Sequence, residues 1–340
     1  MTAQRRNIYD KDTLDQFLKY IPSQEHLDLL YLLTYADMSA VTFGFLNSWK
    51  LNLLNELYKI ASEALQQPHR PSEAEDYHRA LEELQMKVFV FIDEENIDFL
   101  SKDYVTRFLY GMPLSYLKYA TCQKVINDTQ LLMDLSDKAV TVSVLNEEDK
   151  PYSEITICSR NIRGLFSMLT SVFIANGINI NGASIVSSSK DWVIDTLHVD
   201  TIKKGAQLST KLKNKIIEDV TGIIEGKITR FELFKNRRKY IKIKNFENVK
   251  SPTKIDIDNI TSDKFTIVEI IIEDRPGVLF VLTNVLYEMG LDINSCYLAL
   301  EANRAIDTFY ITRDGQKVEE SDFESKLRSK LASLKDEDFK

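Results

Sequence analysis

The chain has 340 residues, of which 44% are hydrophobic and 28% charged, with a formal net charge of −8. This length predicts two or three domains with separate cores, and the acidic balance favours solubility and argues against nucleic acid as the main partner. The apolar runs are strand-sized, which argues against a membrane-spanning helix, and three widely spaced cysteines fit reduced thiols better than a disulfide framework or a zinc site. With no apolar run behind the N-terminal arginines, no signal peptide is expected, and we expect a cytoplasmic protein.

The first 138 residues are predicted to be helical, in two parts, 1–67 and 68–138. In the first part apolar side chains recur every three or four residues, as on one face of a helix: Leu46, Trp49, Leu53, Leu57 and Ile60. A segment with two prolines breaks this pattern, and Ser72 with Glu75 then forms a capping box that starts a second helix. A further helix is expected over about 114–135.

Two units follow, 139–250 and 251–340, in which the apolar pattern changes to that of β-strands. Each reads as strand, glycine-containing loop, helix, strand, hairpin, strand and helix. An offset of 113 residues (277 − 164 = 113) aligns them without a gap as far as the second strand, with these matched pairs: Gly164 and Gly277, Leu165 and Val278, Thr170 and Thr283, Asn179 and Asp292. Beyond that strand Asp195-Thr196 matches Asp307-Thr308 (307 − 195 = 112). The chain therefore carries two copies of one βαβ unit.

Between the two copies lies one basic run with interleaved aromatic side chains, residues 235–244. A run of this kind could be an RNA-binding surface. In an acidic chain we favour a solvated edge strand, whose lysines deter pairing with other strands.

The turn that opens the second copy has the sequence Asp274-Arg275-Pro276-Gly277. Proline cannot lie in mid-strand and glycine permits a tight turn, so the chain is expected to pass directly from the strand into a helix. The N–H groups at such a helix start are unpaired and carry the positive end of the helix dipole, where a small ligand with a carboxylate can dock. The alternative is a turn that only connects strand and helix.

This turn, together with Gly290-Leu291-Asp292-Ile293 at the second strand, resembles the ACT domain, an amino-acid-sensing module. The resemblance implies an α+β fold, with an N-terminal all-α region followed by two tandem ferredoxin-like βαββαβ ACT domains. It also implies a ligand between paired modules, in contact with the first turn and the start of the second strand. Carried over by position, the ligand-binding residues are Asp274, Gly277, Val278 and Asp292 in the second copy and Asn161, Gly164, Leu165 and Asn179 in the first.

The first copy departs from the ACT pattern, because Ile162-Arg163 stands where Arg-Pro is usual. Its Asn161 and Asn179 carry uncharged amides that can hold both ends of an amino-acid ligand, whereas the aspartates of the second copy favour the ammonium group. If only one copy senses a ligand, the intact motif favours the turn around Gly277.

The helical part narrows the resemblance to the family of PII uridylyltransferase/uridylyl-removing enzymes of bacterial nitrogen control. The segments that carry it are 34–40, 47–50, 53–54, 56–58 and, ahead of the second copy, 252–259. The resemblance implies that 1–67 is the C-terminal remnant of an HD-type helical domain and 68–138 a helical connector. It assigns 139–250 to the first ACT domain with its linker and 251–340 to the second.

Catalytic motifs of that family are missing from the sequence. No Gly-Ser pair with paired carboxylates can be assembled for a nucleotidyltransferase, and none of the four histidines is adjacent to an aspartate or at metal-ligand spacing. Asp37 matches the last metal-ligand aspartate of the HD pattern, but one carboxylate does not hold a catalytic metal, and a helix aspartate with a local hydrogen bond is the alternative. We therefore expect no catalytic residue and no cofactor on this chain alone, although Mg²⁺ or Mn²⁺ serves the parent family.

The resulting prediction is a regulatory portion that senses glutamine or another small amino acid and reports to the PII signalling protein or to a catalytic N-terminal portion. Whether any enzyme activity remains is left open, and no nucleic acid or membrane partner is expected. A first alternative is that Asp37 completes a composite metal-dependent HD site, together with a separate N-terminal chain, for removing uridylyl groups from PII. A second is an interaction scaffold in which the ACT pair only mediates self-association.

Overall fold

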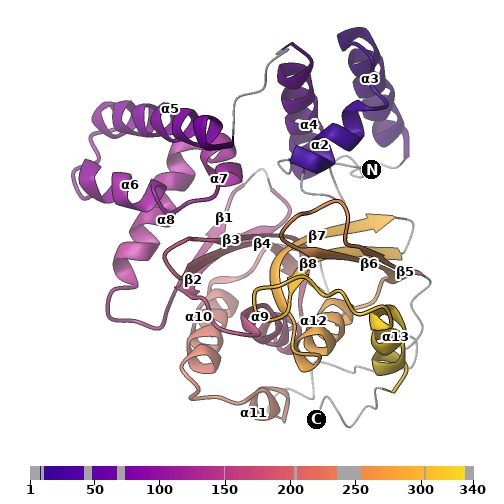
Figure 1. The fold of residues 1–340 in the computed structure, drawn as a ribbon. Coiled ribbons are helices and arrows are strands. Elements are labelled where there is room, and N and C mark those ends of the chain that lie inside the picture. Colours follow the sequence, from indigo (N-terminus) through magenta and orange to yellow (C-terminus); the bar gives the residue numbers. More distant parts are fainter. Residues whose placement is uncertain are drawn as a thin grey trace.

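The structure is a computed structural model that describes residues 8, 11–41, 48–66, 73–148, 150–202, 205–235, 254–301 and 304–333. Helices form the N-terminal part, and two four-stranded antiparallel sheets with their own helices form the rest (Figure 1). This confirms the predicted α+β class with two tandem sheet units. The basic run predicted as an edge strand, 235–244, lies almost entirely outside the described residues. Among the described helices, none is long and apolar enough to cross a lipid bilayer.

In the described residues the first helical group comprises α2 (Lys11–Leu18), α3 (Gln24–Val41) and α4 (Ser48–Gln66). Helices α3 and α4 pack through the rings of Tyr31 and Tyr58, whose centroids lie 4.8 Å apart. The Tyr58 hydroxyl also donates to Asp28 Oδ1 at 2.7 Å. Among the described residues, two small clusters of buried side chains hold this group, and α3 leaves Leu29, Leu32 and Leu33 at least 60% exposed.

The second helical group has four helices: α5 (Glu73–Glu94), α6 (Lys102–Leu109), α7 (Leu114–Tyr119) and α8 (Cys122–Asp134). The helix predicted over 114–135 is divided, because Thr121 caps α8 by accepting a hydrogen bond from the Lys124 N–H. The group packs on one face of the first sheet, where Phe108 stacks on Trp192 with ring centroids 5.4 Å apart. The second helical group and the first sheet therefore share a core.

The first sheet unit contains these elements: β1 (Val140–Asn146), β2 (Ser153–Arg160), α9 (Leu165–Ala175), β3 (Ile178–Ser187), β4 (Trp192–Thr201), α10 (Thr210–Ile224) and the short α11 (Arg230–Lys235). The second unit repeats the pattern: β5 (Lys254–Asp258), β6 (Thr266–Glu273), α12 (Val278–Glu288), β7 (Asp292–Glu301), β8 (Arg304–Thr312) and α13 (Phe323–Ser333). The strand orders are β1-β2-β4-β3 and β5-β6-β8-β7, so the two units have the same topology.

The order of elements along the chain differs in one respect from the βαββαβ expectation. Each unit runs ββαββα, because the edge strand next to β2 or β6 precedes the glycine turn instead of following the last helix. In the first unit the alternating valines of β1 pair with β2, with Val142 opposite Ile157. The β-α-β-β core of each unit matches the expectation, and the fourth strand is supplied from the N-terminal side.

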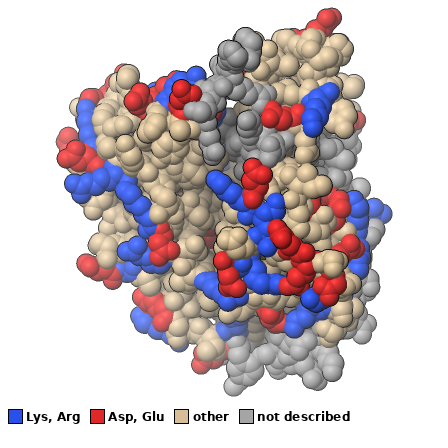
Figure 2. Space-filling model, in the orientation of Figure 1, with Lys and Arg blue, Asp and Glu red and all other residues tan. Residues whose placement is uncertain are grey.

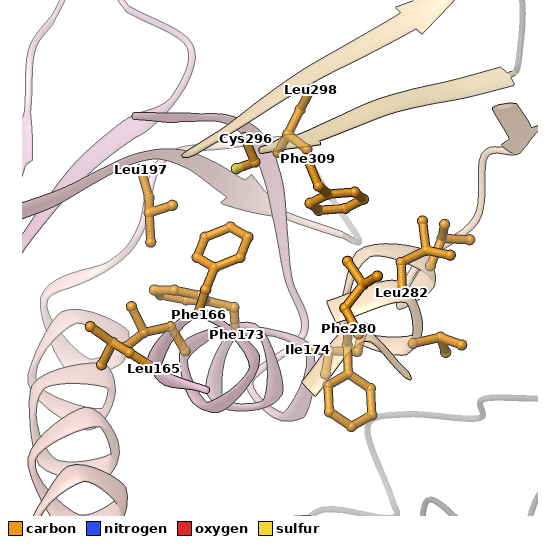
Figure 3. Packing of buried hydrophobic residues seen from close by; sticks show 14 of the residues in the cluster. Leu165, Phe166, Phe173, Ile174, Leu197, Phe280, Leu282, Cys296, Leu298 and Phe309 are labelled. Carbon is orange, nitrogen blue, oxygen red and sulfur yellow. The ribbon is translucent and has the colours of Figure 1, made fainter. Parts of the chain in front are cut away.

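The two units meet through equivalent elements, β3 beside β7 and α9 beside α12. The hydroxyls of Thr170 and Thr283, which the offset of 113 makes equivalent, are hydrogen-bonded to each other at 2.9 Å. Contacts between equivalent surfaces are those of an approximate twofold axis, as in an isologous dimer. Buried side chains of both units form one core, in which Phe166 and Phe173 of α9 point towards the strands (Figure 3).

Each unit begins its first long helix at a glycine with a left-handed conformation, Gly164 at φ +76° and Gly277 at φ +94°. The surroundings of the two glycines differ. A Cβ atom on Gly164 would lie 2.4 Å from a ring carbon of Tyr287, whereas one on Gly277 would meet Ile174 at 3.5 Å. Tyr287 and Ile174 are themselves equivalent (287 − 174 = 113), so the twofold relation is broken at this pair.

We predict that Gly164→Ala destabilises the protein more than Gly277→Ala. Both substitutions force an alanine into the left-handed region, at about 1–2 kcal/mol each. Only Gly164→Ala also overpacks the interface against Tyr287, at roughly a further 1–3 kcal/mol. Urea unfolding measures the difference, and Gly164→Ala combined with Tyr287→Ala should recover the clash component. Equal losses in the two single variants would contradict the packing described for the interface.

Candidate ligand-binding site

A pocket with a volume of about 340 Å³ lies where the two units meet. One side is the β2–α9 turn and the first turn of α9, and the other is formed by Thr283 and Tyr287 of α12 with the start of β7. Strands β3 and β4 add side chains from the first sheet. Small-molecule sites span about 300–1,000 Å³, so this pocket suits a small metabolite.

Four of the eight predicted ligand residues line this pocket: Asn161, Gly164, Leu165 and Asp292. The turn comes from the first copy and the strand start from the second, whereas the prediction groups a turn and a strand start of the same copy. The other four, Asp274, Gly277, Val278 and Asn179, belong to the equivalent position across the twofold axis. There Val278 is buried, and Asn179 donates to Asn181 Oδ1 at 2.9 Å.

Two opposite charges lie at the pocket and come from different units. The Nε atom of Arg163 is 3.9 Å from Oδ1 of Asp292, and their side chains are 51% and 37% exposed. Arg163 also extends over Gly290, where a Cβ atom would lie 2.9 Å from its Nη2. An exposed pair at this distance contributes little to stability. Both side chains therefore remain available to a ligand that carries both charges.

The helix start beside this pair is suited to an anion. Helix α9 begins at Gly164 with no side-chain cap, and it is 11 residues long. Uncapped N–H groups and the positive end of the helix dipole favour negative charge at this point. A ligand carboxylate can thus approach the first turn of α9 and Arg163 together.

The pocket also contains buried polar atoms that lack partners. Among the described residues, four buried side chains have a nitrogen or oxygen without a hydrogen bond, and two of them, Ser167 and Asp195, line the pocket. Both residues are 1% exposed, and the unpartnered atoms are Ser167 Oγ and Asp195 Oδ1. Burial raises the pKa of the Asp195 carboxyl to about 7. Neither residue was among the predicted ligand residues.

Tyr287 is held in place from the side of α12 that faces α11. The guanidinium of Arg230 lies over its ring at 5.2 Å from the centroid, and Arg230 Nη1 donates to Asn284 Oδ1 at 2.5 Å. Burial lowers the pKa of Arg230 below its ordinary value. Because α11 is the last element of the first unit, the first unit positions a side chain of the second unit that lines the pocket.

The predicted metal residue, Asp37, lies on α3 with an exposed side chain. Across the described ranges, no three His, Cys, Asp or Glu side chains are grouped so that they could hold a metal ion. The metal role of Asp37 therefore stays a prediction. On the face shown in Figure 2, basic and acidic side chains are interspersed over the described surface.

Comparison with known proteins finds sequence similarity to a bifunctional enzyme. No protein-family profile matches the chain. It is 29% identical, over 316 residues, to a bifunctional uridylyltransferase/uridylyl-removing enzyme of Zymomonas mobilis subsp. mobilis. The match covers 92% of this chain and 33% of that enzyme, so the chain spans about a third of the relative's length. This bears out the resemblance inferred from the sequence, which was to a portion of such an enzyme.

We predict that the two equivalent buried aspartates make stability fall as pH rises. Burial raises the pKa of Asp195 to about 7 and that of Asp307 to about 8, from an ordinary value of 3.8. Between about pH 4 and pH 8 the unfolded chain therefore loses these protons while the folded protein retains them, so rising pH favours unfolding. Each aspartate lowers the unfolding free energy by up to about 1.4 kcal/mol for each unit by which its folded-state pKa exceeds its unfolded-state pKa. Asp195→Asn or Asp307→Asn should each flatten the fall in unfolding free energy from pH 5 to pH 8.5, measured by urea unfolding. An unchanged pH slope in both variants would contradict the prediction.

Proposed function

We propose that this chain, which resembles about a third of a bifunctional uridylyltransferase/uridylyl-removing enzyme, is the regulatory, amino-acid-sensing portion of such a protein in nitrogen control. Glutamine is the ligand we propose. The observation that carries the proposal is the pocket between the two units, with Arg163 and Asp292 placed together from opposite sides. A free amino acid carries one carboxylate and one ammonium group, which match this pair.

The proposed contacts follow from the charges. The carboxylate of the ligand approaches the first turn of α9 and the guanidinium of Arg163, where N–H donors and positive charge coincide. The ammonium group approaches Asp292, and the side chain of the ligand extends into the pocket. Hydrogen bonds to charged groups are among the stronger ones in proteins, so a small ligand can bind through few contacts.

A ligand in this position touches both units and so favours one arrangement of the pair over others. The first sheet is joined on its other face to α8, where Lys124 donates to Thr196 Oγ1 at 3.0 Å and pairs with the buried Asp128. A shift between the units can thus reach the helical connector. We propose that this coupling reports nitrogen status to a catalytic N-terminal portion or to the PII signalling protein.

One observation favours a second candidate function, a composite site that includes Asp37. This residue lies on the same face of α3 as Leu29 and Leu33, which are 60% and 69% exposed. An exposed apolar ridge next to a carboxylate suits a helix that a catalytic N-terminal portion covers. If so, Asp37→Ala should abolish manganese-dependent uridylyl removal by the two portions together while leaving amino-acid binding intact.

We predict that glutamine binds with a measurable heat in calorimetric titration and that Asp292→Ala weakens binding by about 10- to 100-fold. The loss corresponds to one hydrogen bond to a charged group, roughly 1.5–3 kcal/mol. Arg163→Ala should act in the same direction on the carboxylate. The matched control is Asn179→Ala, at the position equivalent to Asp292 in the first copy, which should leave the affinity unchanged.

Absence of both heat and thermal shift at millimolar glutamine would count against the sensing function. A loss in Asn179→Ala as large as in Asp292→Ala would show instead that the binding site lies across the twofold axis, at the turn around Gly277.

A further inference from the structure

The two pocket-lining residues with an unpartnered buried polar atom, Ser167 and Asp195, both belong to the first unit. The position equivalent to Ser167 in the second copy is Phe280 (280 − 167 = 113), which is buried and packs against Phe234 at 5.3 Å between centroids. A serine therefore stands in the pocket where the repeat has an aromatic ring. Asp195 has an equivalent aspartate, Asp307, but Asp307 does not line this pocket.

Buried polar atoms in folded proteins are paired in the great majority of cases, because an unpaired one loses its hydrogen bonds to water without replacement. Ser167 Oγ and Asp195 Oδ1 are both exceptions to this rule, and both residues line the same cavity. Neither Arg163 nor Asp292, which carry the proposed contacts to the charged ends of an amino acid, satisfies them. The pocket thus has a second polar region besides the charged pair.

We propose that Ser167 and Asp195 determine specificity by receiving the side-chain end of the ligand, and that they select a carboxamide over a carboxylate or a methyl group. This inference rests on the proposed amino-acid-sensing function and adds the residues that choose among amino acids. The Asp195 carboxylate accepts a hydrogen bond from the amide nitrogen. The Ser167 hydroxyl donates to the amide oxygen.

The rejected ligands fail for different physical reasons. A side-chain carboxylate, as in glutamate, brings a second negative charge to a carboxylate that is already out of water. An apolar chain of similar length, as in norleucine, leaves both polar atoms unpaired. A site that hydrogen-bonds a ligand group discriminates strongly against an analogue lacking that group, because its own buried groups then stay unsatisfied.

The discrimination against glutamate should depend on pH. Since burial raises the pKa of Asp195 to about 7, its carboxyl is protonated at pH 6, where it can donate to a ligand carboxylate, and ionised at pH 8, where it repels one. Asp195 interacts electrostatically with two thiols, those of Cys158 in β2 and Cys296 in β7. Burial is the main cause that raises the pKa of each thiol, and neighbouring carboxylates raise it further. Both thiols are therefore neutral over this range. The other ionisable groups that line the pocket are Arg163, Asp292 and Tyr287.

The test is calorimetric titration of the full chain with L-glutamine, L-glutamate and L-norleucine at pH 6 and pH 8. We expect the wild type at pH 8 to prefer glutamine over each of the others by about 10-fold or more, and the preference over glutamate to shrink at pH 6. Asp195→Asn, which offers an N–H donor to a carboxylate, should reduce the glutamine-to-glutamate preference to within a few fold and remove its pH dependence. The matched control Asp307→Asn should keep both.

Ser167→Ala provides a second readout if Asp195→Asn does not fold, as judged by circular dichroism and thermal melting. It should weaken glutamine about 10-fold and leave norleucine unchanged. If glutamine binds and depends on Asp292, yet the preference survives both Asp195→Asn and Ser167→Ala, the specificity role is overturned and the sensing function stands. If the wild type binds no amino acid, both are overturned.

Discussion

The pairing of two sheet units about an approximate twofold axis is the constraint on which the rest of the molecule depends. Helices α9 and α12 lie against each other, strands β3 and β7 lie side by side, and a hydrogen bond between Thr170 and Thr283 joins equivalent points of the repeat. One core runs through both units. Because burial of apolar surface is the main stabilising contribution to folding, neither unit has a complete core without the other.

The pocket is asymmetric although the pairing is approximately twofold. Two identical units would form two identical sites, but the substitution of a few residues at equivalent positions has made the sites differ. In the alignment of the two copies, Tyr287 is equivalent to Ile174, Ser167 to Phe280, and Arg163 to Pro276. In each pair the residue with the hydrogen-bonding or charged side chain lines the pocket at the turn around Gly164, so the polar side chains lie at one of the two equivalent sites.

The fold could be read from the sequence to a large extent, because its signals are local. The glycine turns, the offset of 113 residues and the change from helical to strand periodicity need only neighbouring residues. The place of β1 in the sheet did not follow from its valines, since alternation shows that a segment is a strand and not which strand it pairs with. The division between α7 and α8 depends on one threonine cap.

The candidate site was harder to predict, because its residues come from elements that meet only through the pairing of units. The resemblance supplied Asn161, Gly164, Leu165 and Asp292, but the intact motif favoured the turn around Gly277, and the departure at Ile162-Arg163 counted against the first copy. In the structure Arg163 meets Asp292 across the interface. Asp195 offered one signal, an aspartate at an inward position in an apolar strand, but that signal points to a ligand only once the structure shows that the carboxylate lacks a partner.

The short helix α11 links the first unit to the second through Arg230 and Phe234, and both units belong to one chain. Modules that pair between separate chains come apart on dilution, whereas tethered modules experience a fixed effective concentration. The response of this pocket to its ligand should therefore be independent of how much of the protein a cell contains.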